Sequence, residues 1–224
     1  FDEFGLYGSC ENKEIWIDEK VTKLLFASGC SINKYSSFIL GTSASGLNVA
    51  SDTLESGRTY NFSMNAGSVS DSKDILDLLL ANGRSIDQLI IGLIPSYTSK
   101  PIRSPVVPDS ISLLASTLSF EVVIRRLIDQ PKDSVFYEVN YGDSRSSNLN
   151  LETTSTERLA KESDILLGTD LDNYFHIDEI QLAQLGSILA ISEARSIDVV
   201  AYFYPFPLET TKNKQFTDSY TEYK

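Results

Sequence analysis

Short apolar segments alternate with amphipathic helical segments along this chain of 224 residues, and this order limits the folds open to it. The clearest apolar segment is Gln88–Leu93, in which nearly every residue is hydrophobic. A strand of this kind is buried on both faces, which is typical of a parallel sheet. Strands that alternate with helices through short links form parallel sheets with right-handed crossovers. The sequence therefore predicts an α/β fold, a three-layer sandwich around a mainly parallel sheet.

The remaining elements follow from the same patterns. Apolar residues at helical spacing predict helices over residues 14–28, 70–82, 113–128, 156–164 and 177–194. Apolar segments bounded by glycine, proline or polar residues predict strands over residues 36–40, 59–63, 88–93, 135–139 and 199–204. We expect the last of the strands to be buried. We also expect a single domain over residues 1–224, with a polar excursion at 131–170.

Charge and hydropathy exclude some classes of protein. The chain has 31 acidic and 19 basic residues and a formal net charge of -12. Such a chain repels phosphate backbones, and it has no basic stripe, so we expect no nucleic-acid partner. No apolar run reaches the roughly 18 residues of a membrane span. The sequence begins at Phe1 without a signal-peptide pattern, and we interpret it as a mature or excised fragment.

The cysteine and histidine content limits metal and catalytic chemistry. The two cysteines, Cys10 and Cys30, either form a disulfide, which would imply an oxidising compartment, or remain free thiols. The single histidine, His176, is incompatible with a poly-histidine metal centre. No phosphate-binding glycine motif follows a predicted strand. We therefore expect neither a metal nor a cofactor.

Residues 170–179 place four carboxylates around His176. A calcium loop would need a defined register of ligands and a glycine turn, and neither is present. Acidic residues are favoured at the start of a helix, where they complement the helix dipole. We interpret this segment as a solvated helix start.

The carboxyl ends of the predicted strands are the places to look for chemistry, because ligands bind there in open parallel sheets. Small residues follow two of these strands, as Gly-Thr-Ser-Ala-Ser at 41–45 and as Asn-Ala-Gly at 65–67. Small residues allow backbone N–H groups to approach a substrate. A serine at a strand-to-helix turn can expose its hydroxyl among such donors.

The two segments resemble motifs of the SGNH (GDSL-like) hydrolase family. Phe-Ile-Leu-Gly-Thr-Ser-Ala-Ser at 38–45 is similar to the first block of that family, a strand followed by Gly-Asp-Ser. Tyr-Asn-Phe-Ser-Met-Asn-Ala-Gly at 60–67 is similar to the second block. With Leu-Ile-Ile-Gly-Leu at 89–93, their order resembles the branch found around bacterial cell-envelope polysaccharide and teichoic-acid modification. The resemblance covers residues 30–95 well and 176–207 loosely.

This resemblance implies a flavodoxin-like sheet and a serine esterase or O-acyltransferase. The substrate would be a small-molecule or carbohydrate ester, and an extracytoplasmic location at the cell envelope is favoured over the cytoplasm. Ser43 would be the nucleophile, and the N–H groups of Ser43 and Gly67 would form the oxyanion hole.

The chain departs from the family pattern in two places that concern catalysis. Gly92 is followed by Leu-Ile-Pro where the family has an asparagine, and Asn65 is a candidate replacement for that donor. The family's Asp-x-x-His block is not present before Lys224. Because a serine needs a base, His176 is the candidate base within the chain. The alternative is a catalytically inactive SGNH-like module that binds a glycan or a partner protein.

A literal Gly-Asp-Ser occurs at residues 142–144, within a polar run. No glycine-bearing second strand follows it at a suitable distance. We interpret it as a turn, with Ser144 as the alternative nucleophile.

Overall fold

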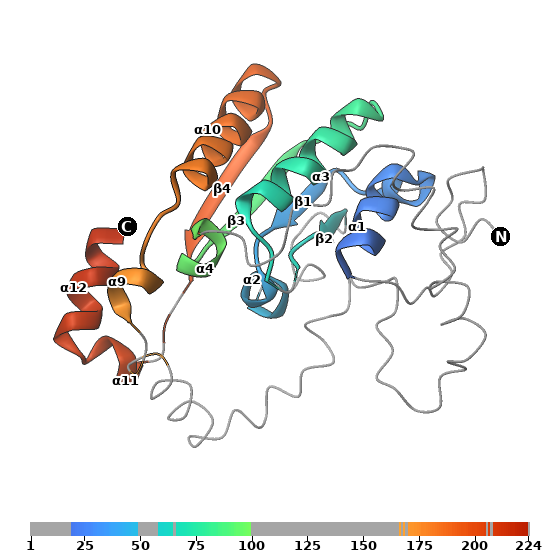
Figure 1. Ribbon diagram of the computed structural model, residues 1–224. Coiled ribbons are helices and arrows are strands. Elements are labelled where there is room, and N and C mark those ends of the chain that lie inside the picture. The colour runs from blue at the N-terminus through green and yellow to red at the C-terminus, as the bar shows by residue number, and fades with distance from the viewer. Residues whose placement is uncertain are drawn as a thin grey trace, which may run out of the picture.

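The centre of the molecule is a four-stranded, all-parallel sheet in the order β2-β1-β3-β4 (Figure 1). The structure is a computed structural model that describes residues 19–48, 58–64, 66–99, 166, 168, 170–204, 206 and 208–223. The strands are β1 (Ser37–Leu40), β2 (Thr59–Asn61), β3 (Gln88–Leu93) and β4 (Asp198–Phe203). The expected α/β fold with a parallel sheet is confirmed.

Strand burial follows position in the sheet. All of β1 is buried, and the four inner residues of β3 are buried as well, as its apolar sequence predicts. In contrast, the prediction that the last strand is buried is wrong, because every residue of β4 is exposed or half-buried. The strand pairs with β3 alone among the described residues, so one of its edges has no described neighbour. Its apolar sequence did not reveal this edge position.

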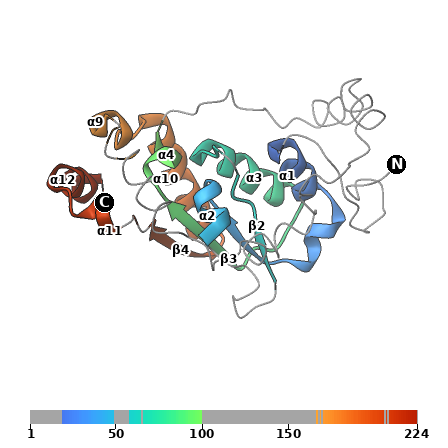
Figure 2. The same cartoon turned by 90° about the horizontal axis from the view of Figure 1, so that it is seen from below.

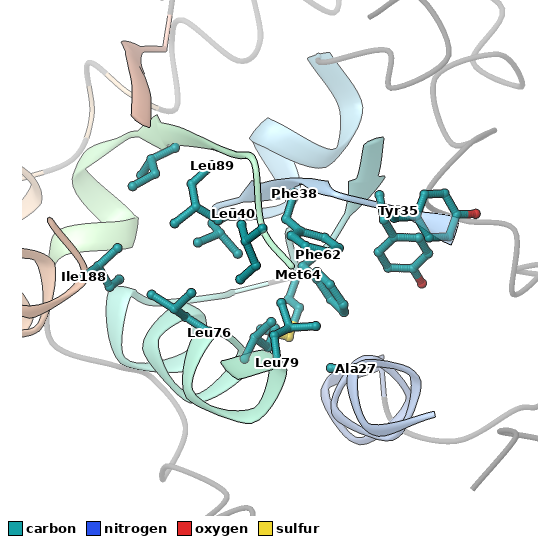
Figure 3. Close-up of a cluster of buried hydrophobic side chains, with 14 of the residues drawn as sticks. Ala27, Tyr35, Phe38, Leu40, Phe62, Met64, Leu76, Leu79, Leu89 and Ile188 are labelled. Carbon is teal, nitrogen blue, oxygen red and sulfur yellow. The ribbon is translucent and has the colours of Figure 1, made fainter. Parts of the chain in front are cut away.

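Three helices cover one face of the sheet, α1 (Glu19–Ser28), α3 (Val69–Ala81) and α10 (Glu179–Ala194). They lie side by side in Figure 2, with α3 between the other two. Leu76 and Leu79 of α3 are fully buried in the same cluster as Phe38 of β1 and Ile188 of α10 (Figure 3). Burial of apolar surface is the chief favourable term in folding. This cluster is the larger of the two that the described residues form, and we call it the main hydrophobic core.

The two Arg-Ser-Ile-Asp segments occupy equivalent places in the fold. Residues 84–87 join α3 to β3, and residues 195–198 lead from α10 into β4. In each segment the isoleucine, Ile86 or Ile197, is buried in the main core. The N–H of Asp198 donates to the carbonyl of Asp87 at 2.9 Å, so the links meet side by side.

A second apolar cluster lies beyond the sheet and contains Leu171, Phe175, Phe216 and Tyr223. It is built from α9 (Leu171–Tyr174) and α12 (Lys214–Tyr223), and the short α11 (Leu208–Thr211) precedes α12 (Figure 1). The hydroxyls of Tyr223 and Thr98 are 2.9 Å apart, which ties α12 to α4 (Pro95–Thr98) after β3. Our sequence analysis did not predict α12, although its aromatic residues at 216, 220 and 223 recur at helical spacing.

Other predicted features fall outside the described residues. These are the helices at 113–128 and 156–164, the strand at 135–139, and nearly all of the excursion at 131–170. Within the described part of the chain, no helix has both the length and the apolar character needed to cross a bilayer.

Candidate functional site

Ser43 is the first residue of α2 (Ser43–Asn48), a short helix that begins just after the carboxyl end of β1. Gly41 and Thr42 form the turn between strand and helix. Gly41 has a φ of +155°, and the Thr42 hydroxyl oxygen accepts a hydrogen bond from the N–H of Ala44 at 3.2 Å. The Ser43 side chain is half-buried. The turn therefore holds the serine at the sheet edge where ligands bind in this class of fold.

Gly67 lies against the turn that carries Ser43. The N–H of Met64 donates to the carbonyl of Gly41 at 3.1 Å, and Thr42 and Met64 form a parallel bridge. A Cβ atom added at Gly67 would lie 2.8 Å from the Gly41 carbonyl oxygen, so only glycine allows this approach. The loops after β1 and β2 are thus in direct contact.

The N–H of Gly67 is already engaged within its own loop. It donates to the carbonyl of Met64 at 3.1 Å. An oxyanion at this place would have to share or replace that hydrogen bond. Asn65, the other candidate donor, lies outside the described residues.

A buried lysine holds the end of β2 beside these loops. Lys23 of α1 is 4% exposed, and its ammonium donates to the carbonyl of Asn61 at 3.1 Å and to the carbonyl of Ser63. A buried charge needs such partners to offset its loss of hydration. Our sequence analysis missed this residue, because Lys23 falls within an amphipathic helix where a lysine is expected at the surface.

Ser45, two residues after Ser43 in α2, is buried at the site. It is 2% exposed, and its side chain occupies the space left by two glycines. A Cβ at Gly41 would lie 2.2 Å from the Ser45 hydroxyl oxygen, and a Cβ at Gly92 would lie 2.0 Å from it. Sequence analysis did not single out Ser45. The sequence feature that could have indicated a close contact here is Gly92, a glycine within a buried strand of otherwise bulky residues.

The Tyr202 hydroxyl of β4 comes close to the same place. A Cβ at Gly92 would lie 2.7 Å from it. Burial raises the pKa of Tyr202, and the nearby Ser45 hydroxyl opposes this rise. The two hydroxyls do not meet the geometry of a hydrogen bond, so the buried Tyr202 oxygen has no partner within the described part of the chain.

His176 is exposed and lies between α9 and α10. Its neighbour Asp178 caps α10, with its carboxylate accepting from the N–H groups of Ile180 and Gln181, while the Asp178 N–H donates to the Thr98 carbonyl at 3.0 Å. The start of α10 is therefore at the carboxyl edge of the sheet. Across the described ranges, however, no hydrogen bond joins His176 or a carboxylate to Ser43.

Polar groups at the start of α3 are paired among themselves. Ser68 and Asp71 form a reciprocal capping box. The side-chain amide of Gln181 accepts from the N–H of Ser70 at 2.9 Å and donates to its hydroxyl oxygen at 2.9 Å. These contacts satisfy the N–H groups of Ser70 and Asp71 in the first turn and join α10 to α3.

Tyr97 of α4, the short helix after β3, is fully buried. Its hydroxyl is near Ser72 of α3, but no hydrogen bond of normal geometry forms with any described residue. Burial raises the pKa of Tyr97 above its ordinary value. The neutral phenol is therefore the form that the fold accommodates.

We expect Tyr97→Phe to make the protein more resistant to alkali. Below pH 10 both folded and unfolded chains hold the Tyr97 proton, whereas above pH 10 the unfolded chain releases it first and is favoured. The wild type should lose about 1.4 kcal/mol more per pH unit than the variant above this pH. Urea unfolding at pH 8, 10 and 11 measures the difference. Equal losses in both proteins at pH 11 would show that Tyr97 ionises freely in the folded state.

Several predicted residues lie outside the part of the chain that the structure describes. They include Cys10 and Ser144. Cys30 begins the 3-10 helix η1 (Cys30–Lys34), but its side chain is not described. Among the described residues, no group of three or more histidine, cysteine or acidic side chains is placed to hold a metal ion. In the acidic segment around His176, Asp178 acts as a helix cap.

The fold is that of a parallel α/β protein with small residues after the carboxyl ends of β1 and β2. Comparison with known proteins adds no closer assignment. No family model matches the chain, and no curated protein or solved structure matches it.

Proposed function

We propose that the chain is an SGNH-like serine esterase or O-acyltransferase, with Ser43 as its nucleophile and an O-acyl ester, such as one on a cell-envelope carbohydrate, as its substrate. The observation that supports this is the contact between the Ser43 turn and Gly67. The two are so close that a side chain at Gly67 would collide with the Gly41 carbonyl oxygen. This contact supports the proposal because it brings the Ser43 turn and a second glycine loop together at one edge of the sheet.

In the proposed reaction, a base removes the proton of the Ser43 hydroxyl as its oxygen attacks the ester carbonyl. The tetrahedral intermediate then expels the alcohol, which takes up the proton, and an acyl-serine remains. Water or a sugar hydroxyl accepts the acyl group and restores the serine. His176 is the candidate base, and the N–H groups of Ser43 and Gly67 are the candidate oxyanion donors. The Gly67 N–H would have to turn from Met64 toward substrate.

A second function, that of a catalytically inactive binding module, is favoured by two observations. Among the described residues no base is hydrogen-bonded to Ser43, and the Gly67 N–H is occupied by the Met64 carbonyl. An unactivated serine is a poor nucleophile at neutral pH. Such a module would bind a glycan or a partner protein at the same edge without reaction.

A fluorophosphonate probe distinguishes the two functions, because it labels activated serines. We expect the folded protein to be labelled at Ser43, as mapped by peptide mass spectrometry, and Ser43→Ala to abolish labelling. The exposed serine of α4 provides the control, and Ser96→Ala should react as the wild type does. His176→Ala should slow labelling by about 100-fold or more, the usual contribution of a general base.

Labelling that persists in Ser43→Ala would contradict the assignment of the nucleophile. An unlabelled wild type with a normal unfolding transition would leave the binding module as the function.

A further inference from the structure

A pocket of about 680 Å³ lies at the amino-terminal edge of the sheet, opposite the edge that carries Ser43. Its walls come from the residues that lead into three strands, namely residues 33–36 before β1, Arg58 before β2, and residues 83–85 with Asp87 before β3. Its volume is in the range of pockets that bind small molecules, about 300–1,000 Å³.

The lining of this amino-edge pocket is positively charged, although the chain as a whole has a net charge of -12. Lys34, Arg58 and Arg84 all line it, against one acidic residue, Asp87. A cleft lined by charges of one sign attracts ligands of the opposite sign. The ligand of this pocket is therefore expected to be an anion.

Arg84 is held in place by neutral groups. Its Nη2 donates to the carbonyl of Gly29 at 2.9 Å, and its Nη1 donates to the side-chain oxygen of Asn33. Within the described ranges no carboxylate pairs with this guanidinium, and its Nε–H is buried without an acceptor. The side chain is thus fixed while its positive charge is not neutralised by an acid.

Lys34 supplies a second cation at the rim. Its ammonium lies 4.8 Å from the centre of the Tyr35 ring, a cation–π contact that orients it, and the residue is exposed. Gly83, another lining residue, has a φ of +68°, and a Cβ built on it would meet no heavy atom within 4 Å. The space beside Gly83 is therefore open.

We propose that the amino-edge pocket binds a small molecule that carries a phosphate or pyrophosphate group. An arginine fork matches the geometry of phosphate oxygens, and a lysine adds a compact point charge. A bare ion would fill little of the volume, so the ligand is an organic phosphate whose remainder occupies the pocket. The proposal is independent of any reaction at Ser43.

A titration of the full ¹⁵N-labelled chain with pyrophosphate, at constant ionic strength set with sodium chloride, tests this. We expect saturable shifts of the backbone amides of residues 33–36 and 83–87. Arg84→Gln and Lys34→Gln should each weaken binding by about tenfold or more. The matched control is Arg195→Gln, which changes the equivalent arginine of the second Arg-Ser-Ile-Asp segment and should bind as the wild type does.

Lys34→Gln removes no hydrogen bond to any residue that the structure describes, and it decides the question if Arg84→Gln proves unstable. Absence of saturable shifts at these amides would overturn the proposal. So would equal binding by the wild type, Lys34→Gln and Arg195→Gln.

Discussion

Leu76→Ala is expected to lower the free energy of unfolding by about 2–5 kcal/mol, the usual cost of removing a large aliphatic side chain from a close-packed core. Leu76 is fully buried in the cluster that joins α3 to the sheet and to α10 (Figure 3). The truncation loses the transfer free energy of the removed atoms and leaves a cavity. Urea unfolding followed by far-ultraviolet circular dichroism measures the change.

Leu182→Ala on α10 is the matched control, because that leucine is 55% exposed. We expect it to change the free energy of unfolding by less than about 0.5 kcal/mol. Equal losses in the two variants would contradict the assignment of α3 to the centre of the core.

Gly92→Ala is expected to cost about 1–3 kcal/mol of stability, the range for an added group in a filled site. The new Cβ would lie 2.0 Å from the Ser45 hydroxyl oxygen and 2.7 Å from the Tyr202 hydroxyl. The double variant with Ser45→Ala should recover part of the loss, because the closest atom is gone while the tyrosine remains. Thermal and urea unfolding of the single and double variants give this coupling.

Gly186→Ala serves as the control for a glycine with free space. It lies within α10, and an added Cβ meets no heavy atom within 4 Å. We expect stability to rise by about 0.5–1 kcal/mol, since glycine is a weak helix former. If Gly92→Ala behaved like Gly186→Ala, the tight contact around Ser45 would not exist.

Local sequence patterns predicted most of the described fold. The predicted strand Gln88–Leu93 has the same bounds in the structure, and α3 and α10 begin within two residues of their predicted starts. These elements are decided by hydrophobic periodicity, which is a local property. The exposure of β4 was not predicted, because an edge strand and a central strand can carry the same apolar residues.

Only part of the candidate site could be predicted from the sequence. Ser43 and Gly67 follow strands that pair directly, so their loops share one edge of the sheet. The contacts of Ser45 with Gly92 and of Lys23 with Asn61 join residues far apart in the chain, and no short pattern encodes them. The hydrogen bond from the Gly67 N–H to the Met64 carbonyl is local, but it depends on one particular turn conformation that the residue types alone do not specify.

The strand order also has a consequence for how the chain emerges during synthesis. Strands β1, β2 and β3 are complete by Leu93, whereas β4 begins at Asp198, about a hundred residues later. At ordinary rates of translation, roughly 5–20 residues per second, the edge of β3 that pairs with β4 remains without that strand for on the order of 5–20 s. An unpaired apolar strand is a template for wrong association, so a chaperone that covers this edge of β3 would protect the nascent polypeptide during the interval.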